Sequence, residues 1–325
     1  MKRLLFVLLG ATLLARPALA EVERAAFIKL SASVLKVEVL RTQGGYALGS
    51  GVVVAAEQVV TNCHVTRDAK EIYVLRGGVR WRVLKQSGDA DHDLCLLHAP
   101  GLVADPVELG SARSLALGQS VNALGYTGGI GIQNSPGEVL ALHRLDGASV
   151  IRSSNFFSSG ASGGGLFDDE LQLVGILTFR LRGGSAHYFA APMEWLRPLL
   201  QDRGRAQAVA PLGAHEVAYW QRPLERQPLF LRAASLERDE KWADLRSLAI
   251  EWAHTAPSDP EPWALLGTAL EQQGRLGQAQ RAFECSLAIE PGYSPARLAL
   301  AQLQQRQGLP ARVAAASPAC TPGVL

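Results

Sequence analysis

Three separated segments of the chain carry side chains that could act together in nucleophilic catalysis. His64 lies at the end of an apolar run, Asp93 directly precedes another, and Ser162 lies in a stretch rich in glycine and serine. A serine hydroxyl is a weak nucleophile, so it needs an imidazole to take its proton and a carboxylate to orient that imidazole. Taken alone, each segment also fits a plainer interpretation, as a packed histidine, a solvated strand end or a flexible loop.

The motifs around these residues resemble those of the trypsin-like serine proteases, in particular the compact bacterial branch that includes the HtrA proteases. The matching segments read Gly49-Ser50-Gly51, Thr61-Asn62-Cys63-His64, Asp91-His92-Asp93-Leu94 and Gly160-Ala161-Ser162-Gly163-Gly164. They keep the family's order of histidine, aspartate and serine, over about residues 27–200. The resemblance implies an endopeptidase without a cofactor, in which Ser162 attacks, His64 acts as base and then acid, and Asp93 orients His64.

The glycines around Ser162 imply an oxyanion hole, because backbone N–H groups must point at the charge that develops on the substrate carbonyl. The amides of Gly160 and Ser162 are the candidates. Ala161 replaces the acid or amide that commonly precedes the nucleophile, and Gly165 replaces a proline. Because an acid at that position can pair with a newly formed N-terminus, Ala161 argues against activation by cutting.

Two other aspartates lie close to the candidate acid. Asp89 and Asp91 precede Asp93, but only Asp93 stands directly before the apolar run, where the family carries its carboxylate. We therefore interpret Asp89 and Asp91 as solvated turn residues.

The spacing of His92, Cys95 and His98 could suggest a metal site. In a strand, however, residues 92 and 98 share one face and residue 95 points to the other, so the three side chains would not converge. We expect no metal site.

By resemblance, a primary substrate pocket should be walled by the segment before the nucleophile and by two strands after it. The residues expected there are Phe156, Phe157, Thr178, Phe179, Arg180 and His187. Since no acidic residue falls clearly in this set, a preference for Lys or Arg is not expected. His187 or Arg180 could favour an acidic residue, and an apolar or small residue fits at least as well.

The candidate site residues must be positioned by short β-branched and leucine-rich runs. Clusters of Gly, Pro, Asp and Ser separate these runs. The clearest runs are residues 34–40, 51–55, 59–65, 72–75, 81–84, 94–97, 120–124, 137–142, 171–178 and 188–191. They are too short and too closely spaced for parallel units with crossover helices. The predicted fold is mainly β, a trypsin-like double antiparallel β-barrel followed by a small all-α module.

The first twenty residues have the features of a secretory signal peptide. Lys2 and Arg3 precede an apolar run, and cleavage is expected after Ala20. A membrane anchor is the competing interpretation, but the run is shorter than the roughly 20 residues that span a bilayer. Cleavage would remove Lys2, Arg3 and Arg16 and lower the net charge from +2 to −1. Without a basic stripe the chain has no mark of a nucleic-acid binder, and we expect a periplasmic or secreted protein.

Beyond the β-rich region the hydrophobic period becomes helical, and a shift of 34 residues pairs similar side chains, as in tetratricopeptide repeats. The expected order is a signal peptide (1–20), a protease domain (21–204), a linker (205–228), a tetratricopeptide-like module (229–310) and a flexible tail (311–325). Trp263, Leu266, Phe283 and Leu287 should be buried between helix pairs. The module could cap the barrel or bind a partner protein.

If His64 and Asp93 are hydrogen-bonded, their backbones run close together and bring Cys63 and Cys95 within range of a disulfide. An exported protein would oxidise such a pair, although two buried free thiols are the alternative. Cys285 and Cys320 form a weaker candidate pair, because no docking is predicted for the tail that carries Cys320.

Two other functions compete with a peptidase. One is a catalytically silent protease-fold scaffold that binds partners through its helices. The other is an esterase on another fold, but there the histidine comes last in the chain, whereas here it comes first.

Overall fold

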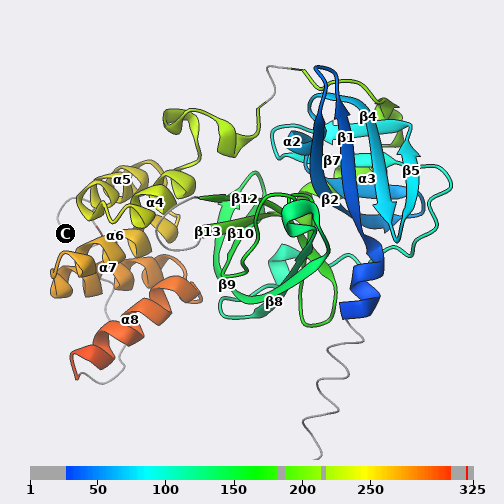
Figure 1. Cartoon of the computed structure of the whole chain (residues 1–325). Coiled ribbons are helices and arrows are strands. Elements are labelled where there is room, and N and C mark those ends of the chain that lie inside the picture. The colour runs from blue at the N-terminus through cyan, green and yellow to red at the C-terminus, as the bar shows by residue number, and fades with distance from the viewer. Residues whose placement is uncertain (1–26, 182–186, 214–216, 309–319, 321–325) are drawn as a thin grey trace, which may run out of the picture.

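Two β units and a helical region make up the chain (Figure 1). The structure is a computed structural model that describes residues 27–181, 187–213, 217–308 and 320. The predicted signal peptide and most of the predicted tail lie outside the described residues. Within the described part, no helix has both the length and the apolar character needed to cross a membrane.

The first β unit is a curled antiparallel sheet whose strands follow the order β14, β6, β7, β3, β2, β1, β4 and β5. They are β1 (Val34–Arg41), β2 (Tyr46–Ala55), β3 (Gln58–Thr61), β4 (Ala69–Arg76), β5 (Val79–Val83), β6 (Lys85–Asp89), β7 (Leu94–His98) and β14 (Gln207–Ala208). Valine and leucine side chains such as Val37, Val59 and Leu97 fill its interior, because they pack well on a pleated surface.

The second β unit is a closed barrel in the order β10, β13, β12, β11, β8 and β9. Its strands are β8 (Ser120–Gly125), β9 (Gln133–Leu145), β10 (Ala148–Ser153), β11 (Gly165–Phe167), β12 (Leu173–Leu181) and β13 (His187–Pro192). Its own core contains Val121, Ile151 and Leu166. The prediction of two antiparallel β units followed by helices is confirmed.

Each predicted apolar run overlaps a strand, but the strands differ in detail. The run 59–65 was expected to be one strand; β3 ends at Thr61, and the helical turn α2 (Cys63–Thr66) carries His64 instead. Four further strands, β6, β10, β11 and β14, had no counterpart among the predicted runs. Strand β6 reads Lys-Gln-Ser-Gly-Asp and has no apolar period, so its pairing with β7 and β14 holds it in the sheet.

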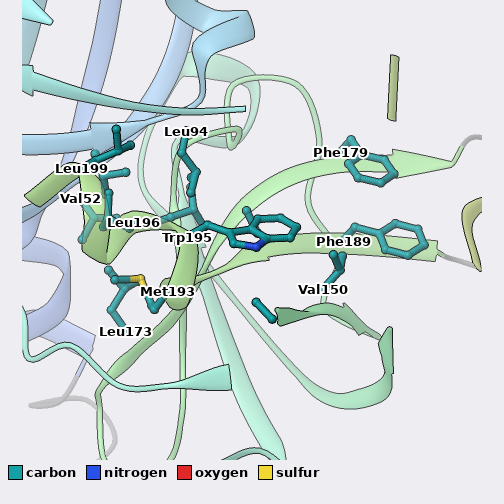
Figure 2. Close-up of a cluster of buried hydrophobic side chains, with 14 of the residues drawn as sticks. Val52, Leu94, Val150, Leu173, Phe179, Phe189, Met193, Trp195, Leu196 and Leu199 are labelled. Atoms are coloured by element: carbon teal, nitrogen blue, oxygen red, sulfur yellow. The ribbon is translucent and has the colours of Figure 1, made fainter. Parts of the chain in front are cut away.

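Helix α3 (Met193–Gln201) lies between the two β units. Its Met193, Trp195 and Leu196 share one buried cluster with side chains of both units, as Figure 2 shows. Because the cluster includes Leu94 of β7 and Phe189 of β13, the packing of α3 fixes the two units against each other.

The C-terminal region consists of successive helices that each pack against the next. They are α4 (Leu229–Arg238), α5 (Trp242–Thr255), α6 (Glu261–Gln272), α7 (Leu276–Ile289) and α8 (Ser294–Arg306). Short connections make neighbouring helices antiparallel. The predicted burial is confirmed, since Trp263, Leu266, Phe283 and Leu287 are 2%, 0%, 0% and 4% exposed.

The helical region packs on the closed barrel (Figure 1). Phe230 of α4 belongs to the same buried cluster as Phe189 of β13. A buried ion pair joins His143 of β9 to Glu261 of α6 at 2.5 Å, and Arg152 of β10 contacts Glu237 of α4 at 2.9 Å. The helices and the barrel therefore share one core.

The segment expected to be a linker contacts the first β unit at several points, through the Val209 and Leu212 amides and the carbonyl of Ala210. Besides β14, it contains the short helix η4 (Tyr219–Gln221), and Tyr219 is 2% exposed. A further difference concerns the tail, where the pairing of Cys285 and Cys320 was the weaker expectation. The structure contains this disulfide, and Cys320 packs against the helical core.

Candidate active site

The candidate base and acid come from neighbouring elements of the first sheet. His64 lies on α2, directly after β3, and Asp93 lies directly before β7, whose Cys95 pairs with Thr61 of β3. Asp93 has a positive φ of 60°, a conformation that aspartate tolerates better than most residues. Its carbonyl oxygen accepts hydrogen bonds from the Cys63 amide at 3.2 Å and the Asn62 side chain at 2.9 Å, which hold this turn beside α2.

His64 and Asp93 form a direct pair. The His64 Nδ1 atom lies 2.6 Å from Asp93 Oδ2, and the His64 backbone N–H donates to Asp93 Oδ1 at 2.8 Å. With an ionised carboxylate, which can only accept, Nδ1 is the donor of this bond and Nε2 is the ring nitrogen left to act as a base. The Asp93 side chain is 1% exposed and that of His64 22% exposed. The His64 ring is therefore partly exposed to solvent, while the Asp93 carboxylate that it contacts is buried.

Ser162 lies in the loop that leads into β11. Its hydroxyl donates to the Thr178 carbonyl at 3.3 Å, and no hydrogen bond joins it to His64 among the described residues. Catalytic hydrogen bonds are often long or misaligned without substrate. The carbonyl of Ser162 accepts from the Ser50 amide at 2.8 Å. The structure thus brings His64 and Asp93 together and places Ser162 on the opposing barrel without a direct bond to them.

The loop that carries Ser162 has a tightly constrained backbone. Gly160 has a φ of +96°, and a Cβ there would lie 2.4 Å from the Tyr126 carbonyl oxygen. The amides of Ala161, Gly163 and Gly164 donate to protein carbonyls. Within the described chain, the amides of Gly160 and Ser162 have no such acceptor. These two donors are therefore available to a ligand.

A cavity of about 180 Å³ adjoins this loop. Phe156, Phe157, Ala161 and Leu177 line much of it. Of the residues predicted for the substrate pocket, only the two phenylalanines contribute to its lining.

The other predicted pocket residues lie elsewhere. Thr178 is buried and bonds to the Ile176 carbonyl, and Phe179 stacks on Phe189. Arg180 is half-buried, with no place in the cavity lining. His187 is buried, its Nδ1 3.4 Å from Arg152, which bridges to the helical region. Burial and then the charge of Arg152 lower the pKa of His187 to about 4. The burial of His187 beside Arg152 argues against a direct role in selecting an acidic substrate residue.

A disulfide joins the neighbour of the candidate base to the strand that follows the candidate acid. Cys63 and Cys95 are bonded, with a Cα–Cα separation of 4.9 Å. This is the pair expected from the proximity of His64 and Asp93. Because Cys95 is bonded to Cys63, it offers no thiolate to a metal.

One group of side chains has the spacing of a metal site, namely Asp91, His92 and Asp146. Both ring nitrogens of His92 already face carboxylates, Nδ1 at 2.6 Å from Asp89 and Nε2 at 3.1 Å from Asp146. Asp91 pairs with Arg222. Burial favours neutral His92, but the bonds to Asp89 and Asp146 outweigh it and raise the pKa of His92. The donors are thus engaged in an ion-pair network, and Asp89 and Asp91 are more than solvated turn residues.

Sequence reasoning missed one residue at the site, Trp220 of η4. Its indole Nε1–H donates to Asp93 Oδ2 at 3.2 Å. The only sequence signal was the aromatic pair Tyr219-Trp220 within a segment rich in Gly, Pro and Arg.

Part of the chain is similar to known serine proteases. Residues 49–176 match the trypsin-like peptidase domain family. The chain is 34% identical over 163 residues to a probable periplasmic serine endoprotease DegP-like of Ectopseudomonas mendocina, covering 47% of this chain and 34% of that protein. It is 28% identical over 160 residues to the serine endoprotease DegS of Haemophilus influenzae, covering 47% of each. The chain thus spans between a third and a half of the curated relatives it matches.

Solved structures show the same fold. The HtrA-type protease AlgW with tripeptide superposes with a TM-score of 0.52 at 26% identity, over 56% of this chain and 64% of that chain. The active form of the Rv3671c protease from M. tuberculosis superposes with a TM-score of 0.53 at 24% identity, over 60% of this chain and 89% of that chain. The fold is a trypsin-like double β-barrel, and residues 49–176 match the family model of the trypsin-like peptidase domain.

Proposed function

We propose that the chain is an exported serine endopeptidase that cleaves peptide bonds with Ser162, His64 and Asp93. The observation that carries this proposal is the 2.6 Å pair between His64 and the buried carboxylate of Asp93, opposite a glycine-rich loop with two unused amides. The similarity to serine endoproteases supports the reaction class. The signal-peptide features of residues 1–20 and the similarity to a probable periplasmic endoprotease support export.

The chemistry follows from these groups. His64 Nε2 takes the proton of the Ser162 hydroxyl as Oγ attacks the peptide carbonyl, and Asp93 stabilises the imidazolium that forms. The amides of Gly160 and Ser162 donate to the oxyanion, and His64 then protonates the leaving amine. Water hydrolyses the acyl-enzyme by the same groups. Before these reaction steps can begin, the Ser162 side chain must turn from Thr178 toward His64.

The cavity beside the nucleophile loop supports a preference for small or apolar substrate residues. Its volume of about 180 Å³ and the side chains of Phe156, Phe157 and Leu177 favour an uncharged group. A peptide-library cleavage profile of the purified protein would test this preference, and dominant cleavage after Lys, Arg, Asp or Glu would contradict it.

For the helical region we propose tetratricopeptide-like helix pairs that stabilise the barrel. The support is the shared core around Phe230 and the buried His143–Glu261 pair. Deleting residues 205–325 should then abolish soluble protease. Full peptidase activity of the truncated chain, with loss of a captured protein, would favour partner binding instead.

A catalytically silent scaffold is the second candidate, because the Ser162 hydroxyl bonds to Thr178 and not to His64. A fluorophosphonate probe separates the two functions. We expect it to label the wild type and Ser159→Ala, a matched change in the same loop, but not Ser162→Ala or His64→Ala. An unlabelled wild type would support the scaffold.

A further inference from the structure

Trp220 reaches the candidate site from outside the peptidase domain match. Its indole N–H donates to Asp93 Oδ2 at 3.2 Å, the oxygen that also faces His64 Nδ1. Its ring meets the His64 ring edge-on at 5.5 Å between centroids and stacks on Phe179 at 4.8 Å. One side chain thus contacts both members of the acid–base pair and the strand beside the nucleophile.

The segment around Trp220 is held against the loop that carries Asp93. The Tyr219 amide donates to the Asp91 carbonyl at 3.0 Å, and Arg222 pairs with the Asp91 carboxylate. On the other side, Arg67 donates to the Gln221 side chain at 2.8 Å. Contacts on both flanks therefore hold η4 beside the loop of Asp93 and beside Arg67.

A second set of contacts ties this segment to the helices. Gln227 Nε2 donates to the carbonyls of Trp220 at 3.1 Å and Arg222 at 2.9 Å. Gln227 stands just before α4, whose Phe230 is buried against the closed barrel. The start of the helical region is therefore two side-chain contacts away from Asp93.

The chemistry of the indole suits this position. A buried carboxylate needs hydrogen-bond donors to remain charged, and an indole N–H is a donor that can neither accept nor carry the proton that His64 exchanges. The Asp93 side chain is 1% exposed, so the bond from the indole N–H reaches a buried carboxylate. Packing alone would be served equally well by a ring without an N–H group.

We propose that Trp220 is a positioning residue for the Asp93–His64 pair, supplied by the segment that leads to the helical region. The inference rests on the proposed peptidase function. It makes the orientation of the candidate acid depend on a part of the chain that the peptidase domain match does not include.

Kinetics of matched tryptophan variants test the proposal. Trp220→Phe keeps an aromatic ring but removes the donor, and a lost hydrogen bond to a charged group should lower kcat about tenfold with little change in KM. Trp81→Phe on β5, outside the site, is the control and should match the wild type. Gln227→Ala should lower kcat less, and combined with Trp220→Phe it should add almost nothing further.

The inactive Ser162→Ala background provides a readout independent of turnover. The proton between His64 Nδ1 and Asp93 should give a downfield NMR resonance that shifts when Trp220→Phe is added and stays in place with Trp81→Phe. An unshifted resonance, or an unchanged kcat in Trp220→Phe, would overturn the positioning role. A wild type that neither reacts with the fluorophosphonate nor cleaves peptides would instead overturn the peptidase function, while the resonance would still report on Trp220.

Discussion

The candidate base and acid on the first sheet are held by different kinds of contact from the Ser162 loop on the closed barrel. Asp93 accepts hydrogen bonds from the His64 backbone, the His64 ring and Trp220, and a disulfide fixes Cys63 beside it. Ser162 is positioned mainly by backbone bonds and by glycine conformations, and its hydroxyl has one bond of 3.3 Å. The candidate acid and base are therefore already hydrogen-bonded to each other, whereas the Ser162 hydroxyl is bonded to Thr178 instead of His64.

Removing the Ser162 hydroxyl should have the largest effect on kcat. Ser162→Ala is expected to lower kcat by about a millionfold, as in a comparable triad, because the hydrogen-bonded pair has no hydroxyl to activate. Peptide hydrolysis rates and thermal unfolding of the same preparations check this. The matched Ser159→Ala variant should keep wild-type turnover, and wild-type turnover in Ser162→Ala would mean that another group is the nucleophile.

A change in the backbone of the Ser162 loop should have the second-largest effect on kcat. Gly160→Ala adds a Cβ where φ is +96° and the Tyr126 carbonyl lies 2.4 Å away, so the peptide unit must move. Losing one oxyanion donor costs about 100- to 1,000-fold in kcat. Gly131→Ala, which has open space around its Cβ, is the control. Equal kcat values for the two variants would show that the amide of residue 160 does not contact the reacting carbonyl.

Features that depend on local sequence patterns could be predicted, and features that depend on contacts between distant segments could not. His64, Asp93 and the β-branched strands around them lie in local patterns, so their types and order were informative. Strand β6 carries no apolar period, and its place follows from pairing with β7 and β14. Trp220 and His187 depend on contacts between distant segments, since one reaches back to Asp93 and the other is covered by Arg152 and the helices. No local pattern encodes such contacts.

The two disulfides provide a matched pair of stability experiments. They join residues separated by 32 and 35 positions, so the chain-entropy model assigns each about 3–4 kcal/mol. Replacing either pair by alanines should lower the free energy of unfolding in urea by about this amount. Only the Cys63/Cys95 variant should also lower kcat of the folded protein, because only this bond lies beside His64. An equal kcat loss in the Cys285/Cys320 variant would contradict this distinction.

The smallest expected effect concerns the interface between the closed barrel and the helices at acid pH. The pKa of His187 falls from 6.5 to about 4 on folding, through burial and then Arg152, so His187 is neutral in the folded protein while the unfolded chain takes up a proton below about pH 6.5. Stability should therefore decline as the pH drops from about 6.5 to 4, by up to about 1.4 kcal/mol for each unit. His92 changes the stability in the opposite direction. Because its pKa is raised on folding, protonated His92 stabilises the fold at low pH, and this contribution is lost as the pH rises through the folded pKa.

The difference in stability between the wild type and His187→Gln isolates the contribution of His187. Urea unfolding at several pH values should give a flatter profile for His187→Gln, and the exposed His254→Gln on α5 should follow the wild type. Parallel profiles for the wild type and His187→Gln would mean that His187 is solvated and that the helices do not close over β13.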